Sequence, residues 1–389
     1  MKPSPIALIR VHFADLPDPR VERTKTHELM NILTIGLCAA ISGAENWVHV
    51  EEYGLAKLAF LRQFLDLPPD PDAIPSHDTF NRVFEALDAR ALERCLLNWM
   101  MALAEDLAGE VVAIDGKAVR RSLDRRAGQN PLHLVSAWAS ASGLVLGQVA
   151  TDTKSNEITA IPELVEMLDL KGATVTIDAM GCQKEIAGKI VAKQADYVLA
   201  VKDNQPKLHQ DVQRIIAEAQ GPGDPVGCRY HETVEKGHGR IETRKVWCTS
   251  TRGRLFLDQQ DQDWPGLASV ALVEAQRTVD GQTSVERRYY ISSHAGTAAH
   301  AAKHLGHMIR AHWGIENRLH WVLDMAFDED RSRVRRGHGA RNLAVLRKIA
   351  LNLLRRETTY KLGVPSKRRK AGWDDAYLLK ILAGGNLDA

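Results

Sequence analysis

Two aspartates each close a short apolar run, and paired carboxylates in such places are suited to holding a metal ion. Asp115 follows the run VVAI, and Asp178 follows the run VTI. Taken alone, an aspartate at a strand end commonly begins a turn. If the two strands are neighbours in one sheet, both carboxylates emerge at the same edge and repel each other unless a cation lies between them. Oxygen ligands of this kind favour Mg²⁺, for which Mn²⁺ can substitute.

A third candidate ligand lies on a predicted helix. In the stretch IRAHWGIENRLHWVLDMAF, Glu316 belongs to a series in which His312, His320 and Asp324 recur every four residues, so all four share one helix face. An ordinary surface helix also carries a polar stripe of this kind. The His-x3-Glu-x3-His spacing differs from the HExxH pattern of zinc peptidases, which disfavours a zinc site.

Composition restricts the classes of protein that remain. The chain has 389 residues, enough for two or three domains, and five cysteines that form no CxxC pair. An odd number of cysteines without such a pair is typical of a reduced cytoplasmic protein. The longest nearly apolar run, ILTIGLCAAISGA, is shorter than the ~20 residues of a membrane span, and no signal-peptide pattern precedes it. We therefore expect a cytoplasmic protein that does not contact membranes.

The net charge of +2 conceals an uneven distribution along the chain. Residues 305–370 hold 16 Lys and Arg against 6 Asp and Glu, a net charge of +10, which leaves −8 for the remainder. The densest clusters are RSRVRR at 331–336 and KRRK at 367–370. A charge run is often only a solvated helix surface, but this density favours a polyanion such as nucleic acid as the partner.

The elements that must position these residues can be predicted from apolar spacing. Three-to-four periodicity indicates helices through roughly the first hundred residues, and Ser76 is a suitable N-cap for a helix beginning at His77. That helix could enter a DNA groove or belong to a scaffold domain. Three strand-like runs follow from residue 108, and then helices and strands alternate, which predicts a mixed α/β sheet. The predicted segments are a helical N-terminal domain (1–107), the first part of the core (108–224), a β-rich insertion (225–293), the core completion with a basic segment (294–356) and a basic tail (357–389).

Several motifs together resemble the transposases of bacterial insertion sequences, in the branch associated with H repeats. The motifs are AIDGK at 113–117, TIDAMGCQKEIA at 176–187, DYVLAVKDNQP at 196–206, KGHGRIETRKVW at 236–247 and RAHWGIENRLHWVLDMAFDEDRSRVR at 310–335. Each motif alone is weak, but they occur in order over nearly the whole chain.

This resemblance implies a DDE transposase whose RNase H-like catalytic core is interrupted by the β-rich insertion. Asp115, Asp178 and Glu316 match the three catalytic acids, which would hold two Mg²⁺ ions during strand cleavage and transfer. The implied partner is double-stranded DNA, both the inverted repeats at the element's ends and the target, bound by a homodimer. Related transposases carry Tyr, Arg and Lys around the glutamate where this chain has, in order, Ile309, His312 and Leu323.

Polar residues near the same sheet edge and in the basic segment are candidate DNA contacts. Their amine, amide and guanidinium groups suit phosphate oxygens. A turn-forming role for KDNQP (202–206) is an equally good interpretation of part of this set. The candidates are Lys117, Lys202, Asn204, Gln205, His238, Arg240, Arg331, Arg333, Arg335 and Arg336.

Three alternatives to an active transposase can be weighed against the sequence, and one of them, a metal-binding structural protein, explains the carboxylates but not the segment of charge +10. A nuclease on the same fold would cut DNA without joining it, and a transposase-derived protein that has lost activity would only bind DNA. Retention of all three acids favours the active transposase.

Overall fold

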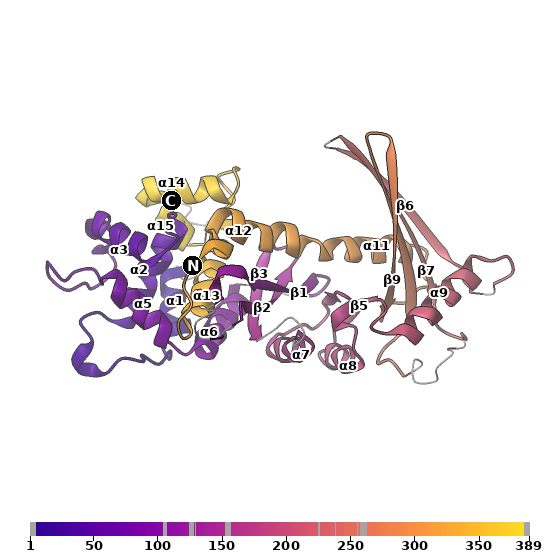
Figure 1. The fold of residues 1–389 in the computed structure, drawn as a ribbon, viewed down its shortest axis with the longest axis horizontal. Helices are drawn as coiled ribbons and strands as arrows, with labels where there is room; N and C mark the ends of the chain where they lie inside the picture. The colour runs from indigo at the N-terminus through magenta and orange to yellow at the C-terminus, as the bar shows by residue number, and fades with distance from the viewer. Residues whose placement is uncertain are drawn as a thin grey trace.

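The computed structural model describes residues 5–103, 107–123, 128, 130–151, 157–224, 226–237, 239–254, 256 and 263–384. The molecule is elongated, with helices at one end, a sheet flanked by helices in the middle and a projecting group of strands at the other end (Figure 1). The first and last described segments lie at the same, helical end (Figure 1). No helix in the described part of the chain combines the length and apolar character needed to cross a bilayer.

The helical end is built mainly by the first hundred residues, as predicted. Ser76 caps α5, since its side chain accepts a hydrogen bond from the Thr79 amide. Helix α2 lies at the centre of this region, and 12 of its 13 residues are buried. The apolar run ILTIGLCAAISGA is therefore mostly a buried core helix. The helices are α1 (Pro5–Phe13), α2 (Leu29–Ile41), α3 (Trp47–Ala56), α4 (Leu58–Leu61), α5 (His77–Ala86) and α6 (Ala89–Leu103), with a 3-10 turn at Glu22–Thr24.

The last segments of the chain return to the helical end. Helix α13 (Gly339–Arg356) packs on α2, α5 and α6 and also on the sheet, so it joins the two regions. Its Asn342 amide donates to the carbonyl of Phe84, and its Asn352 accepts from the amide of Val145. Helices α14 (Val364–Trp373) and α15 (Asp375–Leu382) follow. The apolar spacing of DDAYLLKIL at 374–382 predicts a short helix, which α15 confirms, whereas no pattern in the sequence predicts α14.

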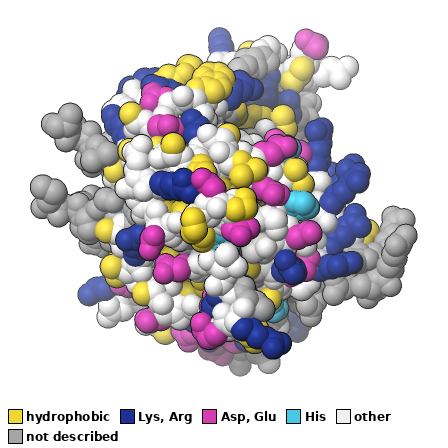
Figure 2. Space-filling model, turned by 90° about the vertical axis from the view of Figure 1, so that its left-hand side faces the viewer, with side chains coloured by type: hydrophobic (Ala, Val, Ile, Leu, Met, Phe, Trp, Pro, Cys, Tyr) yellow, Lys and Arg dark blue, Asp and Glu magenta, His cyan; other side chains and the backbone are white. Residues whose placement is uncertain are grey.

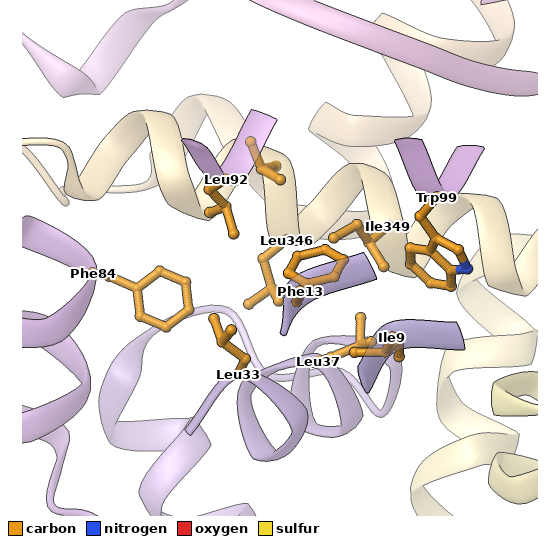
Figure 3. A pocket seen from close by; sticks show the side chains of 10 residues that line it. Ile9, Phe13, Leu33, Leu37, Phe84, Leu92, Trp99, Leu346 and Ile349 are labelled. Carbon is orange, nitrogen blue, oxygen red and sulfur yellow. The ribbon is translucent and has the colours of Figure 1, made fainter. Parts of the chain in front are cut away.

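The helical end contains a small apolar cavity of about 20 Å³ between α1, α2, α5, α6 and α13. Figure 3 shows that the side chains lining it come from helices far apart in the sequence and point toward one another. The volume would admit about one water molecule, but the lining offers almost no polar surface to bind it. We interpret the cavity as a packing defect and not as a ligand site.

The middle of the molecule is one nine-stranded mixed sheet with the order β3-β2-β1-β4-β5-β9-β8-β7-β6. Strands β1 to β3 are antiparallel, β4 and β5 run parallel to β1, and β9 is antiparallel to β5. This is the RNase H-like mixed arrangement that was expected for the core. The strands of this half are β1 (Val111–Val119), β2 (Leu132–Ala139), β3 (Leu144–Thr151), β4 (Thr174–Ile177) and β5 (Asp196–Val201).

The strands of the predicted insertion extend the core sheet instead of forming a separate one. Strand β9 (Gln282–Ser292) pairs with β5, and β8 (Ser269–Val279), β7 (Arg240–Ser250) and β6 (Arg229–Gly237) follow as an antiparallel meander. Their outer halves form the projection in Figure 1. The dipeptide Asp-Gly at 280–281 is a strong signal for a hairpin turn, and it joins β8 to β9 with both Asp280 and Gly281 at positive φ.

Helices cover both faces of the sheet (Figure 1). On one face lie α7 (Glu157–Met167), α8 (Lys184–Ala192) and α9 (Pro206–Gln220). On the other lie α11 (Ala301–His312), a π-helical segment η5 (Ile315–His320) and α12 (Trp321–Phe327). Short 3-10 turns follow β1 at Arg120–Ser122, β4 at Ala179–Gly181 and α12 at Glu329–Arg331.

Gly116 is required where β1 packs on α7. A Cβ atom at this position would lie 2.2 Å from Oε1 of Glu157 and 2.5 Å from Nε2 of His133, two buried groups that are hydrogen-bonded to each other at 2.6 Å. We expect Gly116→Ala to lower the free energy of unfolding by about 1–3 kcal/mol, because the strand or the pair must move. Urea denaturation measures this. Gly237→Ala is the matched control, since its Cβ would meet no atom within 4 Å.

Candidate active site

The register of β1 and β4 brings the two aspartates together. The last parallel pair is Ile114 with Ile177, so Asp115 and Asp178 are the next residue on each of two adjacent strands. The sequence predicted that Asp115 ends its strand, and this was wrong. β1 continues to Val119 because β2 still pairs with it there, and only the β4 side is open at Asp115.

The third acid is carried by the π-helical segment between α11 and α12. Such wide turns are rare and occur often at functional sites. Within it, Glu316 and His320 project toward β1. The Nδ1 atom of His320 lies 3.6 Å from Oδ2 of Asp115 and 3.6 Å from Oε2 of Glu316. The sequence series with a spacing of four indicated this shared face, but His320 was not among the predicted site residues.

One ligand atom from each of Asp115, Glu316 and His320 lies within 4.8 Å of the others. The solvent exposure of the side chains increases across the cluster, from 6% for His320 to 16% for Asp115 and 53% for Glu316. A substrate or ion would therefore approach from the side of Glu316. Two carboxylates and one imidazole form a donor set that fits Mg²⁺ or Mn²⁺.

The electrostatics of the cluster also fit a cation. Burial, followed by the negative charges of Glu316 and Asp178, raises the pKa of Asp115 to about 8. The neighbouring imidazole of His320 holds the pKa of Glu316 below its usual range. Two carboxylates that cannot both ionise without cost are a mark of a cation-binding arrangement.

Asp178 lies beside this cluster and also begins a turn. Its Oδ1 atom accepts a hydrogen bond of 3.0 Å from the Met180 amide at the start of the 3-10 turn. Two residues earlier, Thr176 shares a hydrogen bond of 3.1 Å with Nδ1 of His312. The helix that carries Glu316 is thereby held against β4 as well as β1. Burial lowers the pKa of His312.

The predicted DNA contacts after β5 have internal partners. The Asn204 amide donates to the carbonyl of Ala179, and the Gln205 amide donates to the carbonyl of Cys182. These bonds tie the loop after β5 to the loop that begins at Asp178, which is the turn-forming interpretation of KDNQP. Lys202 is exposed at the same edge.

Lys117 also has internal partners. Its Nζ atom bonds to Asp324, lies 2.8 Å from Oε2 of Glu329 and is 3.8 Å from Asp330, and its side chain is only 12% exposed. Burial alone would lower the pKa of Lys117, but the acids around it raise it. The prediction that Lys117 contacts DNA remains without support from these contacts.

The arginines of RSRVRR line a groove of about 1320 Å³ between the helical end and the loop after α12. Figure 2 looks onto the helical end, and basic side chains gather along its right-hand margin. One wall carries Arg120, Arg121, Arg331, Arg333, Arg335 and Arg336, and the other carries residues of α3 and α5 with the preceding turn, including His49, His77, Asp78 and Asn81.

The arginines of this groove differ in their partners. Arg331 lies 3.5 Å from Asp328, Arg335 donates to the carbonyl of Arg121, and Arg120 lies 3.2 Å from Asp330. Arg333 and Arg336 have no ion-pair partner among the described residues and are exposed. Sequence reasoning missed Arg120 and Arg121, because their distance from RSRVRR along the chain hides their proximity in space.

Other basic residues have different placements. Arg240, at the tip of the projecting strands, is exposed and lies 2.6 Å from Glu242. His238 lies outside the described residues. In KRRK, Lys367 donates to the carbonyl of Leu354 and Arg368 to that of Ala40, and both side chains are buried. Half of that cluster therefore stabilises the fold and is not free for a polyanion, contrary to the prediction.

Two family models match this chain. A family model described as the transposase DDE domain matches residues 106–353, and a model for a region associated with that domain matches residues 10–100. The chain belongs to the DDE transposase family. The positions at which related transposases have Tyr, Arg and Lys are filled in this family member by buried Ile309 and Leu323 and by His312, which bonds β4.

Close relatives of this transposase-family chain occur in Escherichia coli. "Putative transposase YncI" of strain O157:H7 is 43% identical over 374 residues, covering 95% of this chain and 92% of the relative. "H repeat-associated putative transposase YhhI" of strain K12 is 38% identical, covering 97% and 98%. Among solved structures, a piggyBac transposase synaptic complex with hairpin DNA aligns with a TM-score of 0.45 and 11% identity, covering 99% of this chain and 82% of that chain.

Proposed function

We propose that the protein cuts DNA at the ends of an insertion element and joins the freed ends to target DNA, in a reaction that requires Mg²⁺ or Mn²⁺. The observation that carries this proposal is the convergence of Asp115 and Glu316, with Asp178 next in register on the adjacent strand. Asp115, Asp178 and Glu316 would hold the ions, with His320 as a further donor. When bound, the ions activate the attacking oxygen and stabilise the leaving oxygen.

The residues of the chain supply positioning around that chemistry. Asp115 and His320 are fixed by burial, whereas the more exposed Glu316 faces the side from which a phosphodiester would approach. Asn204 and Gln205 hold the loop that begins at Asp178 through its backbone carbonyls. Joining both ends of an element in one event needs two such sites, so the proposal includes a dimer assembled on DNA.

The groove lined by the arginines is the proposed path of the DNA. Arg333 and Arg336, which have no ion-pair partner in the described part of the chain, offer their guanidinium groups to phosphates. On the opposite wall, Asn81 and His77 bond to Glu85 and Glu51 and would exchange these partners for base edges. Double replacement of Arg333 and Arg336 by alanine should reduce the slope of log K against log salt by about 2, because each lost phosphate contact removes about one unit. Fluorescence anisotropy of labelled duplex DNA measures the slope.

The control for this prediction is Arg277→Ala, which changes an exposed arginine on the projecting strands. It should leave both the affinity and the salt slope near those of the wild type. An unchanged slope in the double variant would exclude the groove as the DNA path, whatever the outcome for catalysis.

The proposed activity is tested with labelled DNA carrying the sequences that flank the gene, incubated with Mg²⁺, Mn²⁺ or EDTA. We expect metal-dependent nicking at the element ends and joined products, both absent in Asp178→Ala. Cutting without joined product would support a nuclease instead. Tight binding without any cutting in either metal would identify an inactive DNA-binding descendant, with Asp178 reduced to a turn residue.

A further inference from the structure

Lys117 connects the strand and the helix that carry the proposed metal ligands. It lies two residues after Asp115 on β1, so the two side chains point to the same face of the sheet. Its ammonium bonds to Asp324 on α12, four residues after His320 and eight after Glu316. It also bonds at 2.8 Å to Glu329, whose side chain is 1% exposed and which lies two residues after the end of α12.

The contact between Lys117 and Asp324 lies next to the candidate metal site, because β1 and the helix advance by similar distances between the two levels. Two residues of a strand advance about 6.6–6.8 Å, and four residues of a helix advance about 6 Å. The step from Asp115 to Lys117 therefore matches the step from His320 to Asp324. Asp115 faces His320 and Glu316 at one level, and Lys117 faces Asp324 at the next.

Packing on the opposite face of β1 limits how far the strand can shift relative to the sheet and α7. Directly between Asp115 and Lys117, Gly116 packs against the buried pair of His133 and Glu157 with no room for a Cβ atom. Just past the strand, the Arg120 amide donates to Asp330 at 3.3 Å, beside Glu329. The apolar packing of Ile315 and Leu319 in the core that includes Ala113 holds the helix to β1 before the site, and the bonds of Lys117 hold it beyond the site.

We infer that Lys117 is a positioning residue, which holds Asp115 and Glu316 at the separation that a divalent cation needs. When Asp115 is ionised, as cation binding requires, the mutual repulsion of the two carboxylates pushes the strand and the helix apart unless another contact opposes it. Lys117 supplies that contact through Asp324 and Glu329, beyond the reach of the bound cation. This inference rests on the proposed metal site, and it replaces the expectation that Lys117 contacts a DNA phosphate.

The test compares Lys117→Met, Lys117→Arg and Asp324→Asn with the wild type, using Mn²⁺ alone as the probe. Electron paramagnetic resonance of free Mn²⁺ measures metal affinity, and anisotropy in EDTA measures DNA affinity. We expect Lys117→Met and Asp324→Asn to weaken Mn²⁺ binding by about 10- to 100-fold, as for other groups that orient metal ligands. DNA affinity should stay within about twofold, and Lys117→Arg should restore most of the Mn²⁺ affinity, because it retains the charge.

Several outcomes separate the possibilities. Lys303→Met, an exposed lysine on α11, is the control and should change neither affinity. Lys117→Met leaves the buried Glu329 without its bonded ammonium, so the Lys117→Met protein could fail to fold. In that case the Mn²⁺ affinity of Asp324→Asn tests the positioning role. If the wild type binds Mn²⁺ and Asp324→Asn binds it equally well, the positioning role is wrong. Loss of DNA affinity with unchanged Mn²⁺ affinity would make Lys117 a DNA contact. If the wild type itself binds no Mn²⁺, the proposed function fails first.

Discussion

Asp115→Asn is expected to abolish metal-dependent DNA cleavage while leaving the folded protein at least as stable as the wild type. Cleavage should fall by about 10³-fold or more, equivalent to about 4 kcal/mol of activation free energy, because Asp115 is the buried centre of the proposed ligand set. Binding of end DNA in EDTA should persist, since no proposed phosphate contact is altered. Gel assays of cleavage and of binding check the two parts separately.

The same substitution has a predicted effect on stability. The pKa of Asp115 is raised from 3.8 to about 8 in the folded protein, so the folded state retains a proton that the unfolded chain releases. Stability in EDTA should therefore fall as pH rises from about 4 to 8, and asparagine removes this contribution. Thermal unfolding across that pH range should show the decline in the wild type and a weaker one in Asp115→Asn. Added Mn²⁺ should stabilise only the wild type.

A variant that is both inactive and clearly less stable in EDTA would contradict this account. It would mean that Asp115 stabilises the fold through contacts that outweigh its repulsion with Glu316. An active variant would remove Asp115 from the catalytic set altogether.

Glu93→Ala is expected to cause a large loss of stability, the largest among single substitutions in the buried polar network that Glu93 forms with Arg341, Gln148 and Lys348. Glu93, on α6, is 3% exposed and accepts hydrogen bonds from both Arg341 on α13 and Gln148 on β3. Gln148 in turn accepts from the buried Lys348 at 2.5 Å, and burial lowers the pKa of Lys348 to about 8. Removing the carboxylate leaves the buried Lys348 and the partly buried Arg341 with less compensation, at a cost of about 3–5 kcal/mol.

Chemical denaturation measures this loss, and two further variants define its origin. Glu22→Ala removes an acid whose side chain is 89% exposed, and should change the unfolding free energy by less than about 0.5 kcal/mol. The double variant Glu93→Gln with Arg341→Met should lose less than the sum of the single losses, because both partners of one pair leave together. A loss below about 1 kcal/mol in Glu93→Ala would show that the network holds the helical end and the sheet together only weakly.

Much of the fold followed from local patterns. Apolar periodicity predicted the helices of the first hundred residues and the strand runs of the sheet, because each element must bury one face whatever its partners are. The run around α2 lacked the length for a membrane span, and its burial as a central helix agrees with that limit. Helix α14 was missed because KRRK has no apolar stripe, and its Lys367 and Arg368 are buried by partners outside the helix, which include backbone carbonyls and the ring of Phe327.

The candidate site shows most clearly which features local sequence patterns predict and which depend on tertiary contacts. The sequence by itself determined which acids to consider, since apolar runs that end in aspartate and a polar series with a spacing of four are local patterns. Only the tertiary structure decided what each residue contacts. It places Asp115 and Asp178 at neighbouring positions of two adjacent strands and adds His320 to the cluster. It also shows that Lys117 forms salt bridges with Asp324 and Glu329. The reason is physical: these contacts join residues up to 212 positions apart, and their distances depend on strand pairing and helix packing, which no local pattern encodes.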